Sequence, residues 1–243
     1  MYSERPAALP DATVWTRSAP PGPGGTPLVL PDGCMDLLWS GGRLSIAGPD
    51  THAFRPDDGA APGHSRHTGV RFHPGTAPRL LGVPAHELRD HRVPLEELRP
   101  AAEVRRLTAA VAAAPDPGAA LERVARAWAA AAPPADPLVA GVVRDLAAGL
   151  TVGAVADAAG LGARLLHRRS LTAFGYGPKT LARVLRLQRA LALARGGLPT
   201  ALAAARAGYA DQPHLAREAR DLTGCRFSVL VPGAHTPASG SGA

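Results

Sequence analysis

The sequence predicts an α+β protein in which a β-containing N-terminal domain with helices precedes an all-α C-terminal domain. Short apolar runs separated by turn residues fill the first hundred positions, whereas helical patterning continues almost unbroken over residues 138–224. The proline-rich segment 133–137 lies between the two patterns. We therefore expect a β-rich sensor or oligomerisation domain, connecting helices, a helical domain and a disordered polar tail, at residues 1–100, 101–135, 136–231 and 232–243.

The N-terminal part is expected to contain a small antiparallel sheet. Residues 1–27 are rich in Pro and Gly and predict irregular chain, with one short strand near residues 14–16. Gly41 and Gly42 separate the apolar runs 35–39 and 44–47, a pattern that predicts a hairpin, and residues 68–72 predict a further strand. Helical patterning then predicts three helices, at residues 85–90, 101–114 and 118–132.

The charge of the chain is divided unevenly. Residues 1–135 hold 14 Arg and 14 acidic residues, whereas residues 136–243 hold 13 basic and 6 acidic residues and so carry the whole net charge of +7. A basic half next to a neutral half indicates a polyanion-binding domain, with nucleic acid the first candidate and an anionic membrane the second. The sequence shows neither an apolar run of 18 residues nor a secretory signal pattern, so we expect a cytoplasmic, nucleoid-associated protein without a membrane partner.

One sequence device occurs twice in the basic half. Ala156 precedes Gly160 by four residues, and about 48 residues later Ala204 precedes Gly208 in the same way. Two helices that cross steeply over a short turn need a small side chain at their contact and a turn residue that tolerates positive φ. The repeat therefore predicts two helix-turn-helix units.

The second helix of each unit is expected to read DNA, and the helix over residues 178–195 is expected to join the units and to contact phosphate. When the apolar residues of these helices face inward, basic and polar side chains remain on the outer faces. The residues expected to contact DNA are Arg164, His167 and Arg168 in the first unit, Lys179, Arg183 and Arg186 on the joining helix, and Gln212, His214 and Arg217 in the second unit.

Residues 138–224 resemble the DNA-binding domain of the AraC family of transcription regulators. The resemblance is carried by residues 165–179, by residues 183–191 and most specifically by residues 208–224. It implies two helix-turn-helix units linked by a central helix, with base-reading residues in the first halves of both recognition helices. The family usually has a hydroxyl residue where this chain has Gly162 and Pro213, and the residues after Gly224 also depart from the family, which predicts an absent or altered final helix.

Residues 30–39, 47–51 and 69–90 resemble the N-terminal domain of a less studied subgroup of these regulators, which implies a sensing or dimerising module. Residues 34–39 alternate along a predicted strand, so some of their side chains face a cavity or ordinary core. Arg71 could receive an anionic effector or pair with an aspartate. The effector residues expected on these grounds are Cys34, Asp36, Trp39 and Arg71.

The sequence favours a bacterial transcription regulator, activator or repressor, that performs no catalysis. His52, His64, His67 and His73 lie close in sequence but lack the spacing of a metal site, so neither a metal nor a cofactor is expected. The alternatives are an effector-free architectural DNA-binding protein and a metal-dependent enzyme domain fused to a DNA-binding domain. The expected partners are double-stranded DNA, a small-molecule effector, RNA polymerase and a second copy of the chain.

Overall fold

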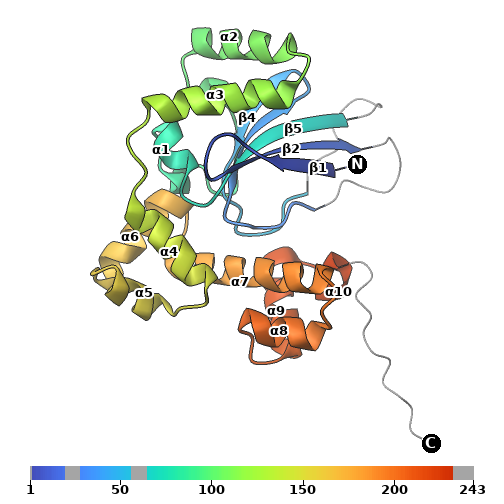
Figure 1. The fold of residues 1–243 in the computed structure, drawn as a ribbon, viewed down its shortest axis with the longest axis vertical. Coiled ribbons are helices and arrows are strands. Elements are labelled where there is room, and N and C mark those ends of the chain that lie inside the picture. The colour runs from blue at the N-terminus through green and yellow to red at the C-terminus, as the bar shows by residue number, and fades with distance from the viewer. Residues whose placement is uncertain (1, 20–27, 56–64, 232–243) are drawn as a thin grey trace, which may run out of the picture.

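The computed structural model describes residues 2–19, 28–55 and 65–231, and it contains an N-terminal sheet unit followed by a helical unit (Figure 1). The sheet is antiparallel throughout, in the order β1-β2-β5-β3-β4-β6. Its strands are β1 (Tyr2–Pro6), β2 (Ala12–Ala19), β3 (Met35–Ser40), β4 (Arg43–Ala47), β5 (Ser65–Phe72) and β6 (Arg92–Pro94). The predicted hairpin is therefore correct, and β2 and β5 contain the other two predicted strands. The irregular chain expected over residues 1–27 is wrong at residues 2–6, which form β1 at the edge of the sheet.

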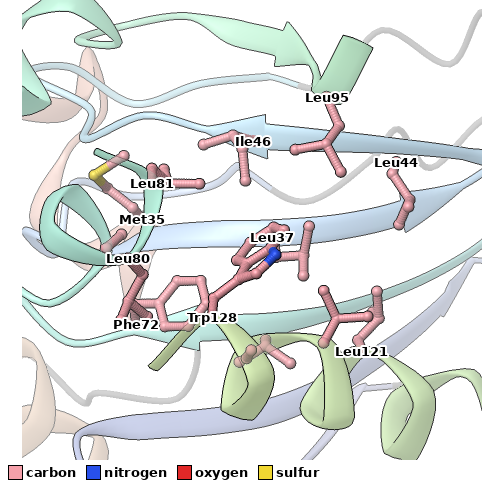
Figure 2. Packing of buried hydrophobic residues seen from close by; sticks show 14 of the residues in the cluster. Met35, Leu37, Leu44, Ile46, Phe72, Leu80, Leu81, Leu95, Leu121 and Trp128 are labelled. Atoms are coloured by element: carbon pink, nitrogen blue, oxygen red, sulfur yellow. The ribbon is translucent and has the colours of Figure 1, made fainter. Parts of the chain in front are cut away.

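Alternation along the strands gives the sheet one apolar face. Leu37, Val70 and Phe72 are almost completely buried on this face, where Leu121 and Trp128 of an overlying helix pack against them (Figure 2). Because fully burying each large apolar side chain contributes about 1.5–3 kcal/mol, this layer provides the main stabilisation of the sheet unit.

The helices predicted between the two domains complete the core of the sheet unit. They are α2 (Ala101–Ala112) and α3 (Pro117–Ala131), and their buried residues belong to the same apolar cluster as those of the strands. Asp116 caps α3 by accepting hydrogen bonds from the backbone N–H groups of Gly118 and Ala119. The helix predicted at residues 85–90 is wrong: only the 3₁₀ turn η1 (Ala85–Glu87) forms there. The other helical turns of this unit are α1 (Ala77–Leu81) and the 3₁₀ turn η2 (Leu95–Glu97).

The C-terminal part is entirely helical, which confirms the predicted α+β class. Its helices form two apolar clusters, and the longest helix, α7, contributes Leu181 to the first and Leu187 and Leu191 to the second. The final short helix, expected to be absent or altered, is present. The helices are α4 (Pro137–Ala147), α5 (Val152–Ala158), α6 (Ala163–Phe174), α7 (Pro178–Arg195), α8 (Thr200–Ala207), α9 (Gln212–Thr223) and α10 (Phe227–Leu230).

The sheet unit contacts both ends of the helical unit. Near the first cluster, Arg89 Nη1 donates a hydrogen bond of 3.2 Å to the carbonyl oxygen of Gly175. Near the second, Gln188 Nε2 donates to the carbonyl oxygen of Pro31 at 2.5 Å, and the backbone N–H of Ala53 donates to the carbonyl of Leu222 at 3.0 Å. The placement of each unit therefore depends on residues distant in sequence.

Candidate nucleic-acid interface

The repeated sequence device forms two helix-turn-helix units. Ala156 on α5 and Ala204 on α8 are buried where the paired helices meet. Gly160 and Gly208 end these helices at φ values of +63° and +89°, in the left-handed region that favours glycine. The α5–α6 pair is therefore the first unit and the α8–α9 pair the second.

In the first unit, α6 buries Leu166 and Phe174 and leaves Arg164, His167 and Arg168 exposed. These three lie on the first half of the helix, as expected of a reading face. The helix has Gly162 at its N-cap and receives no side-chain capping bond there. Its first backbone N–H groups are therefore left to solvent or to a bound anion.

Arg169 differs from its neighbours on α6. Its Nη1 atom lies 3.0 Å from Oδ2 of Asp136, whose other oxygen caps the start of α4. This pair joins α6 to α4, so Arg169 lies on the side of the helix that faces α4. It provides a control position next to Arg168.

In the second unit, α9 begins at a capped N-terminus. Asp211 Oδ1 accepts a hydrogen bond of 2.6 Å from the backbone N–H of His214. Gln212 and Arg217 are exposed on this helix, whereas the His214 ring is half-buried and lies edge-on to the Tyr209 ring at 5.2 Å. The second unit thus presents Gln212 and Arg217 freely and His214 in part.

Replacing Asp211 with alanine is expected to lower the free energy of unfolding by about 1 kcal/mol, because an N-terminal N–H of α9 loses its acceptor. Thermal or urea unfolding of the full chain measures the change, and Asp211→Asn should restore most of the loss. An unchanged unfolding free energy in Asp211→Ala would show that the cap contributes nothing.

The joining helix α7 carries the basic residues expected to contact phosphate, but they differ in their surroundings. Lys179 is exposed. Arg183 Nε lies 3.0 Å from Glu218 Oε2, and Arg186 Nη2 lies 2.8 Å from Glu218 Oε1. Lys179 is therefore free to meet a phosphate, whereas both arginines are paired across the α7–α9 contact.

Glu218 is the central residue of this contact, and it was not among the sequence-predicted residues. Its carboxylate is buried and also accepts a hydrogen bond of 3.0 Å from Tyr209 Oη. Burial by itself raises the pKa of Glu218, but the hydrogen bonds from Arg186 and Arg183 outweigh it, so the pKa lies below its ordinary value. The sequence feature that could have identified Glu218 is its position three residues after buried Leu215, which places a carboxylate on the apolar stripe of α9.

The residues expected to bind an effector lie on two faces of the sheet. Arg71 Nε is 3.4 Å from Asp36 Oδ1 and 3.5 Å from Asp32 Oδ2, and Asp36 also accepts a hydrogen bond of 2.6 Å from Trp15 Nε1. Burial raises the pKa of Asp36. Trp39, which follows Asp36 by three residues on β3, packs against the apolar cluster on the opposite face of the sheet.

Cys34 and Tyr176 lie beside this polar group. The backbone N–H of Cys34 donates to Asp32 Oδ1 at 2.9 Å, and burial raises the pKa of the thiol. Tyr176, between α6 and α7, has a buried hydroxyl without a hydrogen-bond partner among the described residues, and burial raises its pKa too. We name Trp15, Asp32, Cys34, Asp36 and Arg71 the sheet polar cluster.

The sequence predicted no metal site. Within residues 2–19, 28–55 and 65–231, no group of three or more His, Cys, Asp and Glu side chains is arranged to hold a metal ion. His64 and the tail 232–243 lie outside the described residues. Cys34 and Cys225 are free thiols.

No helix in the part of the chain that the structure describes has the length and hydropathy required to span a bilayer.

Two protein-family models match the chain. Residues 155–231 match a helix-turn-helix domain of the AraC type, and residues 12–94 match a domain of unknown function, DUF6597. The first match runs from the middle of α5 to the residue after α10 and so covers most of the first helix-turn-helix unit and all of the second. The second spans β2 to β6. A search of curated proteins finds no match.

Among solved structures, the chain is similar to ToxT from Vibrio cholerae. A crystal structure of ToxT from strain O395 is 7% identical, with a TM-score of 0.48 over 93% of this chain and 100% of that one. ToxT from strain SCE256, described as bound to an unsaturated fatty acid, is 9% identical, with a TM-score of 0.46 over 93% and 96% of the two chains. A likeness of this size carries no conclusion about ligand or function.

Proposed function

We propose that this chain, whose C-terminal domain belongs to the AraC-type helix-turn-helix family, is a sequence-specific transcription regulator that reads two successive major grooves. The observation that carries the proposal is the attachment of both helix-turn-helix units to one helix, α7, with the first halves of α6 and α9 exposed. The 18 residues of α7 span roughly 27 Å, which is close to one turn of B-DNA, about 34 Å.

The two kinds of contact have different roles in this proposal. Lys179 and the uncapped start of α6 attract phosphate, which supplies affinity without sequence information. Arg164, Arg168 and Arg217 present guanidinium groups that can donate two hydrogen bonds to guanine, and Gln212 can pair in the same way with adenine. His167 and His214 flank these positions. Sequence preference should therefore reside in α6 and α9.

The N-terminal sheet unit is assigned a regulatory role without catalysis. It binds a small-molecule effector, joins two copies of the chain, or does both, and RNA polymerase is the expected partner of the DNA-bound form. The contacts from Arg89, Gln188 and Ala53 support this role, because they connect the sheet unit to both helix-turn-helix units. We place the protein in the cytoplasm, on the nucleoid.

The proposal is tested by selection of randomised DNA duplexes on the full chain, with sequencing of the retained fraction at several salt concentrations. We expect a motif of two parts whose centres lie about 10 base pairs apart, because α7 sets the separation of the readers. Affinity should fall with salt in proportion to the number of phosphates contacted.

Retention without sequence preference at every salt concentration would contradict the regulator assignment and support an architectural DNA-binding protein instead. Enrichment of a single half-site would show that only one unit reads bases. The selected duplex then serves as the ligand in the experiments below.

A further inference from the structure

A cleft of about 540 Å³ lies between the sheet unit and the first helix-turn-helix unit. One wall comes from α1 and the residues around it, and the other from α4 and the end of α6. The volume falls within the roughly 300–1,000 Å³ of small-molecule sites, which also favour the junctions between domains. The apolar side chains that line it include Pro78, Val83, Val139, Ala140, Val143 and Ala173.

The two walls touch directly beside the cleft. A Cβ atom added at Gly75 would lie 2.3 Å from Cγ1 of Val139, and the residue has a φ of +86°. The loop that carries Gly75 is therefore pressed against α4 at one edge. A molecule in the cleft would contact both walls and would stabilise the arrangement in which they face each other.

The charged groups of the cleft favour an anion. Arg79 donates a hydrogen bond of 3.0 Å to the carbonyl oxygen of Pro133, and within the described residues no carboxylate lies at ion-pair distance from it. Arg144 also lines the cleft, but its Nε lies 3.0 Å from Asp145 Oδ1 and its side chain is 73% exposed, so within the described residues Arg79 is the lining arginine without a carboxylate partner. Of the two lining acids, Asp136 is already paired with Arg169 and caps α4, which leaves Asp11.

The sheet polar cluster is a weaker candidate for the same role. Its guanidinium group lies beside two carboxylates, and one of these also accepts the Trp15 indole N–H. A ligand would have to displace these partners, because a buried charge that loses its partner is costly. Arg79 can accept an anion without losing a carboxylate.

We propose that the cleft between α1 and α4 binds a small, largely apolar molecule with one anionic group, whose charge meets Arg79. The inference rests on the proposed function: the ligand changes DNA binding because it stabilises one position of the first helix-turn-helix unit relative to the sheet unit. It gives the expected effector a location and a chemical class.

The test uses two fluorescent probes of similar size on the full chain. 8-Anilinonaphthalene-1-sulfonate is apolar with one anionic group, and N-phenyl-1-naphthylamine is its neutral counterpart. Arg79→Gln removes the charge, Val143→Trp fills the cleft, and Arg105→Gln on the exposed side of α2 is the matched control. Circular dichroism and the unfolding temperature confirm that each variant is folded.

We expect Arg79→Gln to weaken binding of the anionic probe about five- to tenfold and to leave the neutral probe unchanged, because only the charged contact is lost. Val143→Trp should weaken both probes, and Arg105→Gln neither. Equal binding of the anionic probe to all four proteins would overturn the cleft site. Equal loss of both probes in Arg79→Gln would overturn the anionic class.

A parallel titration with the selected duplex separates this inference from the proposed function. The anionic probe should change the DNA affinity of the unmodified chain at least threefold and that of Val143→Trp little. Specific DNA binding that the probe does not alter would remove the regulatory role of the cleft and leave the regulator assignment intact. Cleft binding in a chain that shows no sequence preference for DNA would contradict the regulator assignment and leave the ligand site in the cleft intact.

Discussion

Replacing Arg168 or Arg217 with alanine is expected to lower the affinity for the selected duplex about tenfold to a hundredfold. Each residue is exposed on the first half of a recognition helix, where a guanidinium group can pair with a guanine edge. Fluorescence anisotropy with the selected duplex and with a scrambled duplex of equal length measures both affinity and discrimination. The loss should be much larger for the selected duplex.

Neighbouring arginines provide the controls. Arg169→Ala removes a side chain one residue from Arg168 that pairs with Asp136, and Arg206→Ala removes an exposed arginine from α8, outside the recognition helix. Both should retain most of the discrimination. An equal loss on selected and scrambled duplexes in Arg168→Ala or Arg217→Ala would reduce that residue to a phosphate contact, with a shallower salt dependence as its signature.

Replacing Glu218 with alanine is expected to lower the free energy of unfolding by about 3 kcal/mol. The substitution leaves Arg183 and Arg186 without their carboxylate and the Tyr209 hydroxyl without its acceptor at the contact of α7 with α9. Urea unfolding at pH 7 measures the change. Glu218→Gln should lose less, because its amide oxygen still accepts a hydrogen bond at the same place.

The contribution of Glu218 should also depend on pH. Because its pKa is lower in the folded chain than its ordinary value of 4.5, the carboxylate stabilises the fold fully above that value. The stabilisation is lost as the pH falls through the folded-state pKa. The difference in unfolding free energy between the unmodified chain and Glu218→Gln should therefore shrink below about pH 4.5. A difference that is constant from pH 7 to pH 3 would contradict this account.

The same pairing alters the expected role of two basic residues. Arg183 and Arg186 were predicted to contact phosphate, yet both guanidinium groups contact Glu218 and hold α9 on α7. We therefore expect their substitution to lower the free energy of unfolding and to loosen the fixed spacing of the two recognition helices. The direct effect on salt dependence should be smaller than for substitution of Lys179.

The local devices of this protein can be predicted from its sequence alone. The repeated alanine and glycine positions predicted both helix-turn-helix units. The hairpin of β3 and β4 followed from two apolar runs around a glycine pair. Each of these depends on residues within a few positions of one another, so periodicity and turn chemistry suffice to predict them.

The tertiary structure brings together groups that are distant in sequence. It paired Glu218 with arginines 32 and 35 positions away, separated Trp39 from the sheet polar cluster, joined α2 and α3 to the core of the sheet, and formed the cleft between α1 and α4. Sequence patterns show which face of an element is apolar. They do not show which element covers it, because that choice depends on packing and charge pairing summed over the whole chain.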